Sequence, residues 1–299
     1  TGSSPARIPG WPDDPQWVCT SDESVHWKDL PKKLLIVGGG VIGCEFACLL
    51  QPLGVDVTVV EMLPGLLPGL DHELGQALHA VFKQRGIACH VDTRVDGMSL
   101  KDGGLEAVLS NGKVLHVDRV LVATGRKPNT AQLGLERAGI ELGPRGFIPV
   151  NDFMETSLAG HYCIGDANGR CLLAHAASAH GVAAVEHALN HSPKPFHSPI
   201  PSAVYTFPEI GAVGMTEQDA KEKGLPISIG HFPIGHLGKA MASHHTEGFV
   251  KTIRNRETDE LLGVHMLGHA ATECIAAAGA LLHQQDRKST RLNSSHVSQ

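Results

Sequence analysis

Three glycines with the spacing of a nucleotide-binding loop follow a short apolar run. The run at residues 34–37 has the length of a buried strand, and Gly38, Gly40 and Gly43 then form the pattern GxGxxG. In such a loop the first glycine permits a tight turn, the second lets a pyrophosphate approach the backbone, and the third lets helix and strand pack closely. The helix N-terminus behind the loop offers unpaired N–H groups and a partial positive charge. The spacing therefore predicts a dinucleotide site.

An acid stands where the ribose of such a nucleotide would need one. A helix is predicted over residues 42–53 and a second strand over 55–60, and Glu61 follows 18 residues after Gly43. A carboxylate at this position can accept hydrogen bonds from both ribose hydroxyls. Residues 62–67 contain no Lys or Arg that would pair with a 2′-phosphate. We therefore expect NAD(H) to be preferred over NADP(H).

The cysteines and histidines predict neither a secreted disulfide framework nor a metal site. The seven cysteines suit a reducing compartment, and we expect a cytoplasmic protein. Cys44 and Cys48 lie one helical turn apart, where small buried residues are ordinary, so we interpret them as packing residues rather than a redox pair. The 19 histidines show no HExxH or clustered Cys/His spacing, and no metal ligand is predicted.

Length and composition indicate a globular protein of more than one domain. The 299 residues are enough for about two domains, and 42% of them are hydrophobic. A net charge of −6 argues against a nucleic-acid or anionic-membrane surface. No apolar run reaches the roughly 20 residues that a membrane-spanning helix needs.

Strands and helices alternate around the glycine loop. Asp71 is predicted to cap a helix over 72–85, whose apolar face carries Leu74, Leu78 and Phe82. This α/β pattern is that of a Rossmann-type domain. Its remaining predicted elements are a strand over 87–91, an antiparallel meander over 94–100, 105–109 and 114–117, and a buried strand over 119–123.

The second half of the chain has a different pattern of predicted strands and helices. Residues 130–165 are predicted to hold a short helix, a turn and two strands, and an alanine-rich helix follows over 174–190. Beyond residue 199 strands and helices mix without βαβ regularity, which predicts an α+β domain. Its predicted strands are 204–207, 210–215, 227–233, 248–254 and 261–267, and its helices are 216–223 and 272–285.

The two ends of the sequence differ from the rest. Residues 6–30 are rich in Pro, Asp and Trp, as in a connector, with a short strand and a helix start over 18–24. Residues 286–299 are polar and lack periodicity, and DRKSTRLNSSH resembles the translation of a sequencing adapter. We expect this tail to be non-native and to take no part in the fold.

Seven motifs occur in an order that resembles the flavin-dependent (class I) pyridine nucleotide–disulfide oxidoreductases, and most of all their dihydrolipoamide dehydrogenase branch. They are GGGVIGCEFA, VVE, ATGRKPN, CIGDANG, LLAHAASAHG, YTFPEIGAVGMTE and LLGVHMLG. The resemblance spans residues 1–285 and implies a Rossmann-type FAD/NAD(P)-binding region plus an α+β C-terminal dimerisation domain. It implies these domains: an FAD-domain remnant with a connector (1–30), an NAD-binding domain (31–126), a return segment of the FAD domain (127–198) and an incomplete dimerisation domain (199–285).

The resemblance also implies roles for single residues. Gly38, Gly40, Gly43, Glu61 and Gly125 would hold NAD. Glu45 resembles a glutamate near the flavin and nicotinamide, although a helix-surface acid is the alternative. The FAD-binding positions implied are Thr1, Gly2, Asp166, Leu173, Ala174 and His175.

The activity implied is oxidation of dihydrolipoamide by NAD⁺ through FAD and a redox disulfide. The implied partners are a second copy bound through residues 199–285, and lipoyl domains of 2-oxoacid dehydrogenase complexes or of the glycine cleavage system. The sequence contains neither the C-x4-C redox pair nor the His-Pro…Glu acid/base motif, so we expect this chain alone, truncated at both ends, to be inactive. A mercuric or glutathione-type reductase, a soluble pyridine nucleotide transhydrogenase and a non-catalytic NAD-binding fragment remain alternatives.

Overall fold

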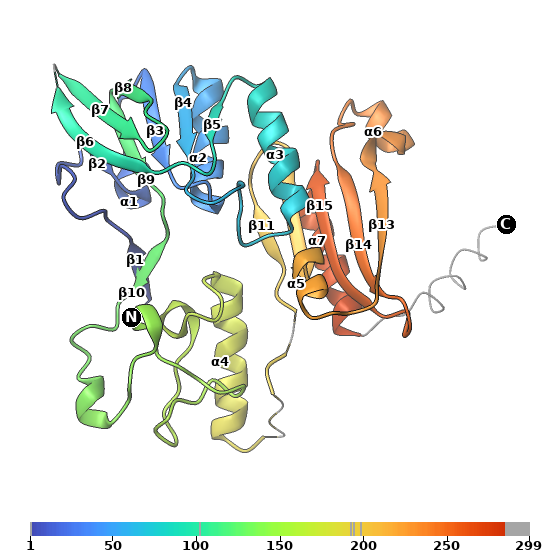
Figure 1. The fold of residues 1–299 in the computed structure, drawn as a ribbon. Helices are drawn as coiled ribbons and strands as arrows, with labels where there is room; N and C mark the ends of the chain where they lie inside the picture. Colours follow the sequence, from blue (N-terminus) through green and yellow to red (C-terminus); the bar gives the residue numbers. More distant parts are fainter. Residues whose placement is uncertain (1, 102, 192, 194, 198, 285–299) are drawn as a thin grey trace. The chain divides into compact units, whose positions relative to one another are not determined.

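The computed structural model describes residues 2–101, 103–191, 193, 195–197 and 199–284, and these form two compact units (Figure 1). The larger unit contains residues 7–124 and 199–284, and the smaller contains 2–6 and 125–197. Thr1 and the predicted non-native tail, residues 286–299, lie outside the described residues.

A five-stranded parallel sheet in the order β2-β9-β3-β4-β5 forms the first half of the larger unit. Residues 34–36 of the central strand are fully buried, as the continuous apolar run predicts for a parallel strand covered on both faces. The strands are β2 (Val18–Cys19), β3 (Lys33–Val37), β4 (Asp56–Val60), β5 (Ala88–His90) and β9 (Arg119–Val122).

Helices and a meander cover the two faces of this sheet. The helices are α1 (Ser21–Ser24), α2 (Val41–Leu50) with the 3-10 turn η1 (Gln51–Leu53), and α3 (His72–Gln84). Asp71 caps α3 as predicted, because its side chain accepts a hydrogen bond from the Glu73 N–H. The meander consists of β6 (Val95–Lys101), β7 (Gly104–Leu109) and β8 (Val114–Val117). The predicted Rossmann-type arrangement is confirmed.

The second half of the larger unit is an antiparallel sheet in the order β11-β12-β15-β14-β13, on which α7 packs. Val213 and Val264 of the sheet meet Ile275 and Ala278 of α7 in a separate apolar core, which confirms the α+β prediction. The elements are β11 (Ser202–Val204), β12 (Glu209–Gly214), α5 (Glu217–Glu222), β13 (Ile227–Pro233), η5 (Ile234–His236), α6 (Gly238–Ala242), β14 (Phe249–Asn255), β15 (Leu261–Gly268) and α7 (Ala271–His283).

The smaller unit is built mostly from turns. Its regular elements are β1 (Ser3–Pro5), β10 (Arg126–Pro128), η2 (Leu135–Ala138), η3 (Pro144–Gly146), η4 (Gly165–Asn168) and the long helix α4 (Ala174–Ala188). The two strands predicted within residues 130–165 are wrong, since that range forms only the isolated bridge Glu155↔Tyr162. The Asn151 side chain accepts hydrogen bonds from the N–H groups of Phe153 and Glu155. Such local bonds compete with a strand ladder.

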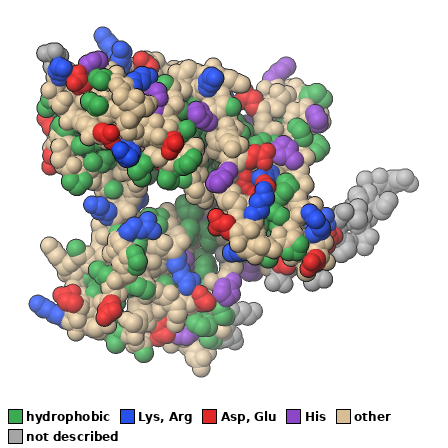
Figure 2. Space-filling model, in the orientation of Figure 1, with side chains coloured by type: hydrophobic (Ala, Val, Ile, Leu, Met, Phe, Trp, Pro, Cys, Tyr) green, Lys and Arg blue, Asp and Glu red, His purple; other side chains and the backbone are tan. Residues whose placement is uncertain are grey.

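The surface carries no sign of a membrane-spanning element among the described residues, where no helix is long and apolar enough to cross a bilayer. On the face drawn in Figure 2, acidic and basic side chains are interspersed with apolar ones. That face therefore offers no large patch of a single charge.

Candidate dinucleotide-binding site

The glycine loop joins the central strand to α2. Gly38 follows β3 with φ +112°, a conformation that disfavours any side chain, and its N–H donates to Val60 O at 2.8 Å. Gly40 is the N-cap of α2 and has an extended backbone (φ −76°, ψ −171°), and no side chain caps the helix. The first-turn N–H groups of α2 are therefore left for another acceptor.

The three glycines of the motif serve two different needs. A Cβ on Gly43 would lie 2.0 Å from Gly38 O, and one on Gly38 would lie 2.4 Å from Ala123 O. Packing therefore requires glycine at both positions. A Cβ on Gly40 would meet no described heavy atom within 4 Å. The space at Gly40, in front of the helix N-terminus, fits a pyrophosphate that approaches the backbone.

Glu61 lies beside this space and its carboxylate is held by backbone. The residue is buried at 8% exposure, and its Oε2 accepts the Gly39 N–H at 2.6 Å while Oε1 accepts the Leu63 N–H at 2.7 Å. A carboxylate offers about four lone-pair sites, so each oxygen keeps one for a ribose hydroxyl. Glu61 thus fits the role that its position at the end of β4 predicts.

Two leucines that sequence reasoning missed complete the loop. Leu67 donates its N–H to Gly39 O at 2.8 Å, and the Leu66 side chain fills the space where a Gly39 Cβ would stand. Both leucines are buried. In the sequence, the signal for them is a pair of apolar residues between Pro64-Gly65 and Pro68-Gly69, in a loop that is ordinarily polar and exposed.

Glu45 lies on α2 and contacts the C-terminal half of the larger unit. Its Oε1 accepts the Tyr205 N–H at 2.8 Å, and burial raises the pKa of its carboxyl group. The side chain is half-buried and the Tyr205 N–H orients it, and a helix-surface acid remains the alternative. Its predicted place near flavin and nicotinamide stays a prediction.

Cys44 and Cys48 are both buried free thiols. Cys44 Sγ donates to Gly39 O at 3.3 Å, and Cys48 Sγ accepts the Phe207 N–H at 3.5 Å. Burial raises the pKa of both thiols, that of Cys44 well above its usual range. Since the thiolate is the reactive form, both side chains are poor nucleophiles.

Alkylation should separate these thiols from an exposed one. With iodoacetamide at pH 8 we expect Cys274, which is exposed, to react at least about tenfold faster than Cys44 or Cys48, because burial shields these two thiols from the reagent and raises their pKa. Peptide mass spectrometry over time measures the rates, and a sample in denaturant is the control. Rapid labelling of Cys44, or a Cys44–Cys48 disulfide after mild oxidation, would restore the redox-pair interpretation.

The smaller unit contains most of the residues predicted for FAD. Asp166 lies in η4 and accepts a hydrogen bond from the Ser3 hydroxyl, which in turn accepts one from Arg126 Nε at 2.7 Å. Gly2 has φ +77°, and its carbonyl accepts the Asn129 N–H. Ser3 and Arg126 orient the predicted acceptor Asp166. Sequence reasoning missed both, although Ser3 follows Gly2 and Arg126 follows Gly125, which are predicted site residues.

The remaining predicted residues of this unit lie at a helix start and a turn. Leu173 is the N-cap of α4, and its side chain cannot cap the helix. Ala174 and His175 are exposed in the first turn, whose N–H groups carry the partial positive charge of a helix N-terminus. Gly125, predicted to contact NAD, has φ +119° and accepts the Ala6 N–H at 2.9 Å. The first-turn N–H groups of α4 can donate hydrogen bonds to a polar edge of a cofactor. The individual roles of these residues stay predictions.

Comparison with protein families gives two matches. The family described as pyridine nucleotide-disulphide oxidoreductase matches residues 1–181. The pyridine nucleotide-disulphide oxidoreductase dimerisation domain matches residues 200–296. Together the two matches cover both the parallel-sheet half and the antiparallel-sheet half of the chain.

Individual relatives agree with these matches. The chain is 39% identical to a dihydrolipoyl dehydrogenase of Thermus scotoductus over 93% of its own length and 61% of the relative's. It is 40% identical to a dihydrolipoyl dehydrogenase of Synechocystis over 99% of its length and 65% of the relative's. The chain therefore spans less than two thirds of these proteins.

Solved structures share the fold. LpdA from Mycobacterium tuberculosis is similar with a TM-score of 0.89 and 30% identity, over 96% of this chain and 63% of that one. The HOCl-induced flavoprotein disulfide reductase RclA from Escherichia coli is similar with a TM-score of 0.87 and 26% identity, over 97% of this chain and 67% of that one.

Proposed function

The chain belongs to the pyridine nucleotide-disulphide oxidoreductase family, and from this premise we propose that it forms the NAD-binding and dimerisation part of a dihydrolipoyl dehydrogenase-type flavoprotein. The observation that carries the NAD assignment is the open space at Gly40, the N-cap of α2, next to Gly39, whose N–H donates to Glu61. A pyrophosphate there would accept first-turn N–H bonds, and the ribose would donate to Glu61. The relatives named dihydrolipoyl dehydrogenase support dihydrolipoamide, a dithiol, as the substrate.

The chain's own groups have defined tasks in this proposal. Bound FAD and NAD would supply the electron and hydride chemistry. Ser3 and Arg126 orient Asp166, which would accept a hydrogen bond from FAD, and the α4 N-terminus would donate to it. Glu61 would fix the adenosine half of NAD. The Tyr205 N–H orients the side chain of Glu45 on α2.

The matched segments support the remaining assignments. Residues 31–126 would form the NAD domain, 127–198 a return segment of the FAD domain, and 199–285 the surface that pairs with a second copy. Lipoyl domains of 2-oxoacid dehydrogenase complexes or of the glycine cleavage system would deliver dihydrolipoamide. We propose a cytoplasmic location, because the cysteines of the described chain are free thiols.

Two assays on the purified chain test the proposal. Titration with NADH, followed by nicotinamide fluorescence, should saturate with a Kd between about 1 µM and 1 mM, the range common for enzyme substrates. A titration that shows no saturation by about 1 mM would contradict the NAD assignment. An NADH-linked lipoamide assay should show no turnover, since Cys44 and Cys48 are buried and weakly ionised. Turnover of about 10 per second would contradict the proposal that this chain's own cysteines do not supply the redox disulfide.

A further inference from the structure

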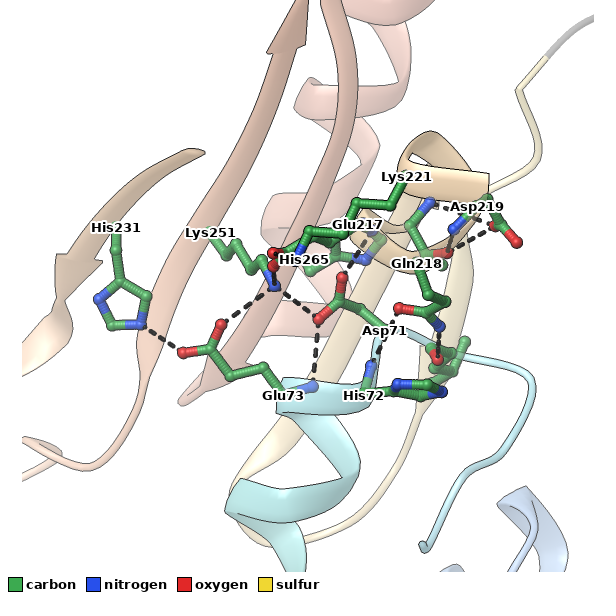
Figure 3. A network of polar contacts seen from close by, with 12 residues as sticks. Asp71, His72, Glu73, Glu217, Gln218, Asp219, Lys221, His231, Lys251 and His265 are labelled. Carbon is green, nitrogen blue, oxygen red and sulfur yellow. Dashed lines mark hydrogen bonds and ion pairs between the residues drawn. The ribbon is translucent and has the colours of Figure 1, made fainter. Parts of the chain in front are cut away.

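A buried lysine joins the two halves of the larger unit. Lys251 on β14 is 2% exposed, and its Nζ lies 2.8 Å from Asp71 Oδ1, 3.1 Å from Glu73 Oε2 and 2.5 Å from Glu217 Oε2. Figure 3 shows the ammonium group among these three carboxylates: Asp71 is the N-cap of α3, Glu73 lies in the first turn of α3, and Glu217 is the first residue of α5. Burial alone would lower the pKa of Lys251, but the hydrogen bonds that its ammonium group donates to the three carboxylates raise it above its ordinary value, so Lys251 remains charged. We call these four residues the Lys251 cluster.

Within the Lys251 cluster, Asp71 accepts hydrogen bonds from the backbone of both α3 and α5. Its Oδ1 also accepts the N–H of Glu73, which caps α3, and its Oδ2 accepts the N–H of Glu217 at the start of α5. Next to it, Gln218 Nε2 donates to Leu70 O at 2.8 Å. A carboxylate that accepts three donors and lies 1% exposed is fixed in place. The C-terminal half therefore holds the end of the loop that precedes α3.

That loop leads directly to the nucleotide site. Leu70 donates its N–H to Leu67 O, and Leu67 donates its own N–H to Gly39 O at 2.8 Å. Leu67 has φ +52°, a left-handed conformation that is unfavourable for a residue other than glycine and persists only where surrounding contacts impose it. Gly39 in turn donates to Glu61 at 2.6 Å. The contacts run without a break from Lys251 through Asp71 and Leu67 to the acid proposed for the ribose.

We propose that Lys251 is a positioning residue for NAD: through Asp71 and Leu67 it sets the place of Gly39 and Glu61, although it does not touch the nucleotide. This inference rests on the proposed function for its ligand. It gives the C-terminal sheet a role in NAD affinity that is separate from pairing with a second copy.

Two variants and a matched control test the positioning role on the purified chain. Lys251→Met removes the charge, and Asp71→Asn weakens the ion pair while keeping a good N-cap, which secures a folded variant. Lys221→Met removes an exposed lysine that pairs with Glu217 on the same cluster. We expect about tenfold weaker NADH binding for the first two and no change for Lys221→Met.

Two further readouts separate positioning from general loosening. Amide hydrogen exchange should become faster at Gly39 and Leu67 in the first two variants, while Leu35 in the central strand is unaffected. In a Glu61→Gln background, Lys251→Met should weaken NADH binding by much less than in the wild type, because the two residues act through one contact path. Equal losses in both backgrounds, or wild-type affinity in a folded Asp71→Asn variant, would overturn the proposal.

Titration of the wild-type chain with NADH distinguishes a failure of the proposed function from a failure of the role of Lys251. Failure of the wild-type chain to bind NADH would remove the proposed function, and the positioning role with it. Wild-type binding together with unchanged exchange at Gly39 and Leu67 in Lys251→Met would overturn only the role of Lys251.

Discussion

Replacing Gly40 by alanine should leave the melting temperature unchanged and weaken NADH binding by about a hundredfold. The backbone of Gly40 is one that alanine adopts easily, and a Cβ there meets no described heavy atom within 4 Å. The methyl group would instead occupy the space proposed for the pyrophosphate. Pushed from the α2 N-terminus, the phosphates would lose charge-assisted hydrogen bonds worth about 1.5–3 kcal/mol each.

Gly43→Ala provides the opposite pattern. Its Cβ would lie 2.0 Å from Gly38 O, so helix and strand must separate. Overpacking of this kind costs about 1–3 kcal/mol, or roughly 2–10 °C in a domain of about 200 residues. We therefore expect Gly43→Ala to lower both the melting temperature and the NADH affinity.

Calorimetry and fluorescence titration of the same samples measure both quantities. Gly238→Ala, at the start of α6, also adds a methyl group that meets no described heavy atom within 4 Å. It should change neither stability nor affinity. If Gly40→Ala bound NADH as tightly as the wild type, the open space at Gly40 would not be the pyrophosphate site.

Sequence alone sufficed where the determining contacts are local or periodic. The glycine loop, the strand that ends at Glu61 and the Asp71 cap each depend on residues within about one element, and all were predicted at their positions. Residues 130–165, where two strands were predicted, show the limit of the same reasoning. That range forms only the isolated bridge Glu155↔Tyr162, and the Asn151 side chain bonds to nearby backbone instead.

The Lys251 cluster could not be predicted from the sequence. Lys251 and Asp71 are 180 positions apart, and a lysine in a predicted strand ordinarily points to solvent. Only the tertiary fold shows that β14 runs beside the start of α3 and α5, where three acids meet one cation. The contact between Ser3 and Arg126 could not be predicted either, because these residues lie far apart in the sequence and meet only where β1 pairs with β10.

NADH should bind at least about tenfold more tightly than NADPH, a difference of about 1.4 kcal/mol. Glu61 is buried at 8% exposure at the end of β4, and residues 62–67 supply no Lys or Arg. A 2′-phosphate about 4 Å from its carboxylate would be repelled by about 4 kcal/mol per unit charge at a dielectric constant of about 20. Screening and rearrangement reduce this energy, but a tenfold preference requires only a third of it.

Removing one acidic charge at either end of β4 tests whether Glu61 causes the preference for NADH over NADPH. Glu61→Gln should narrow the NADH/NADPH ratio, because the amide no longer repels the phosphate. Asp56→Asn removes an exposed acid at the opposite end of β4. The five residue steps from Asp56 to Glu61, of about 3.3 Å each, place it beyond the Debye length of about 8 Å at physiological salt, so the NADH/NADPH ratio should stay as in the wild type. NADPH binding as tight as NADH in the wild-type chain would show that Glu61 does not face the 2′ position of the ribose.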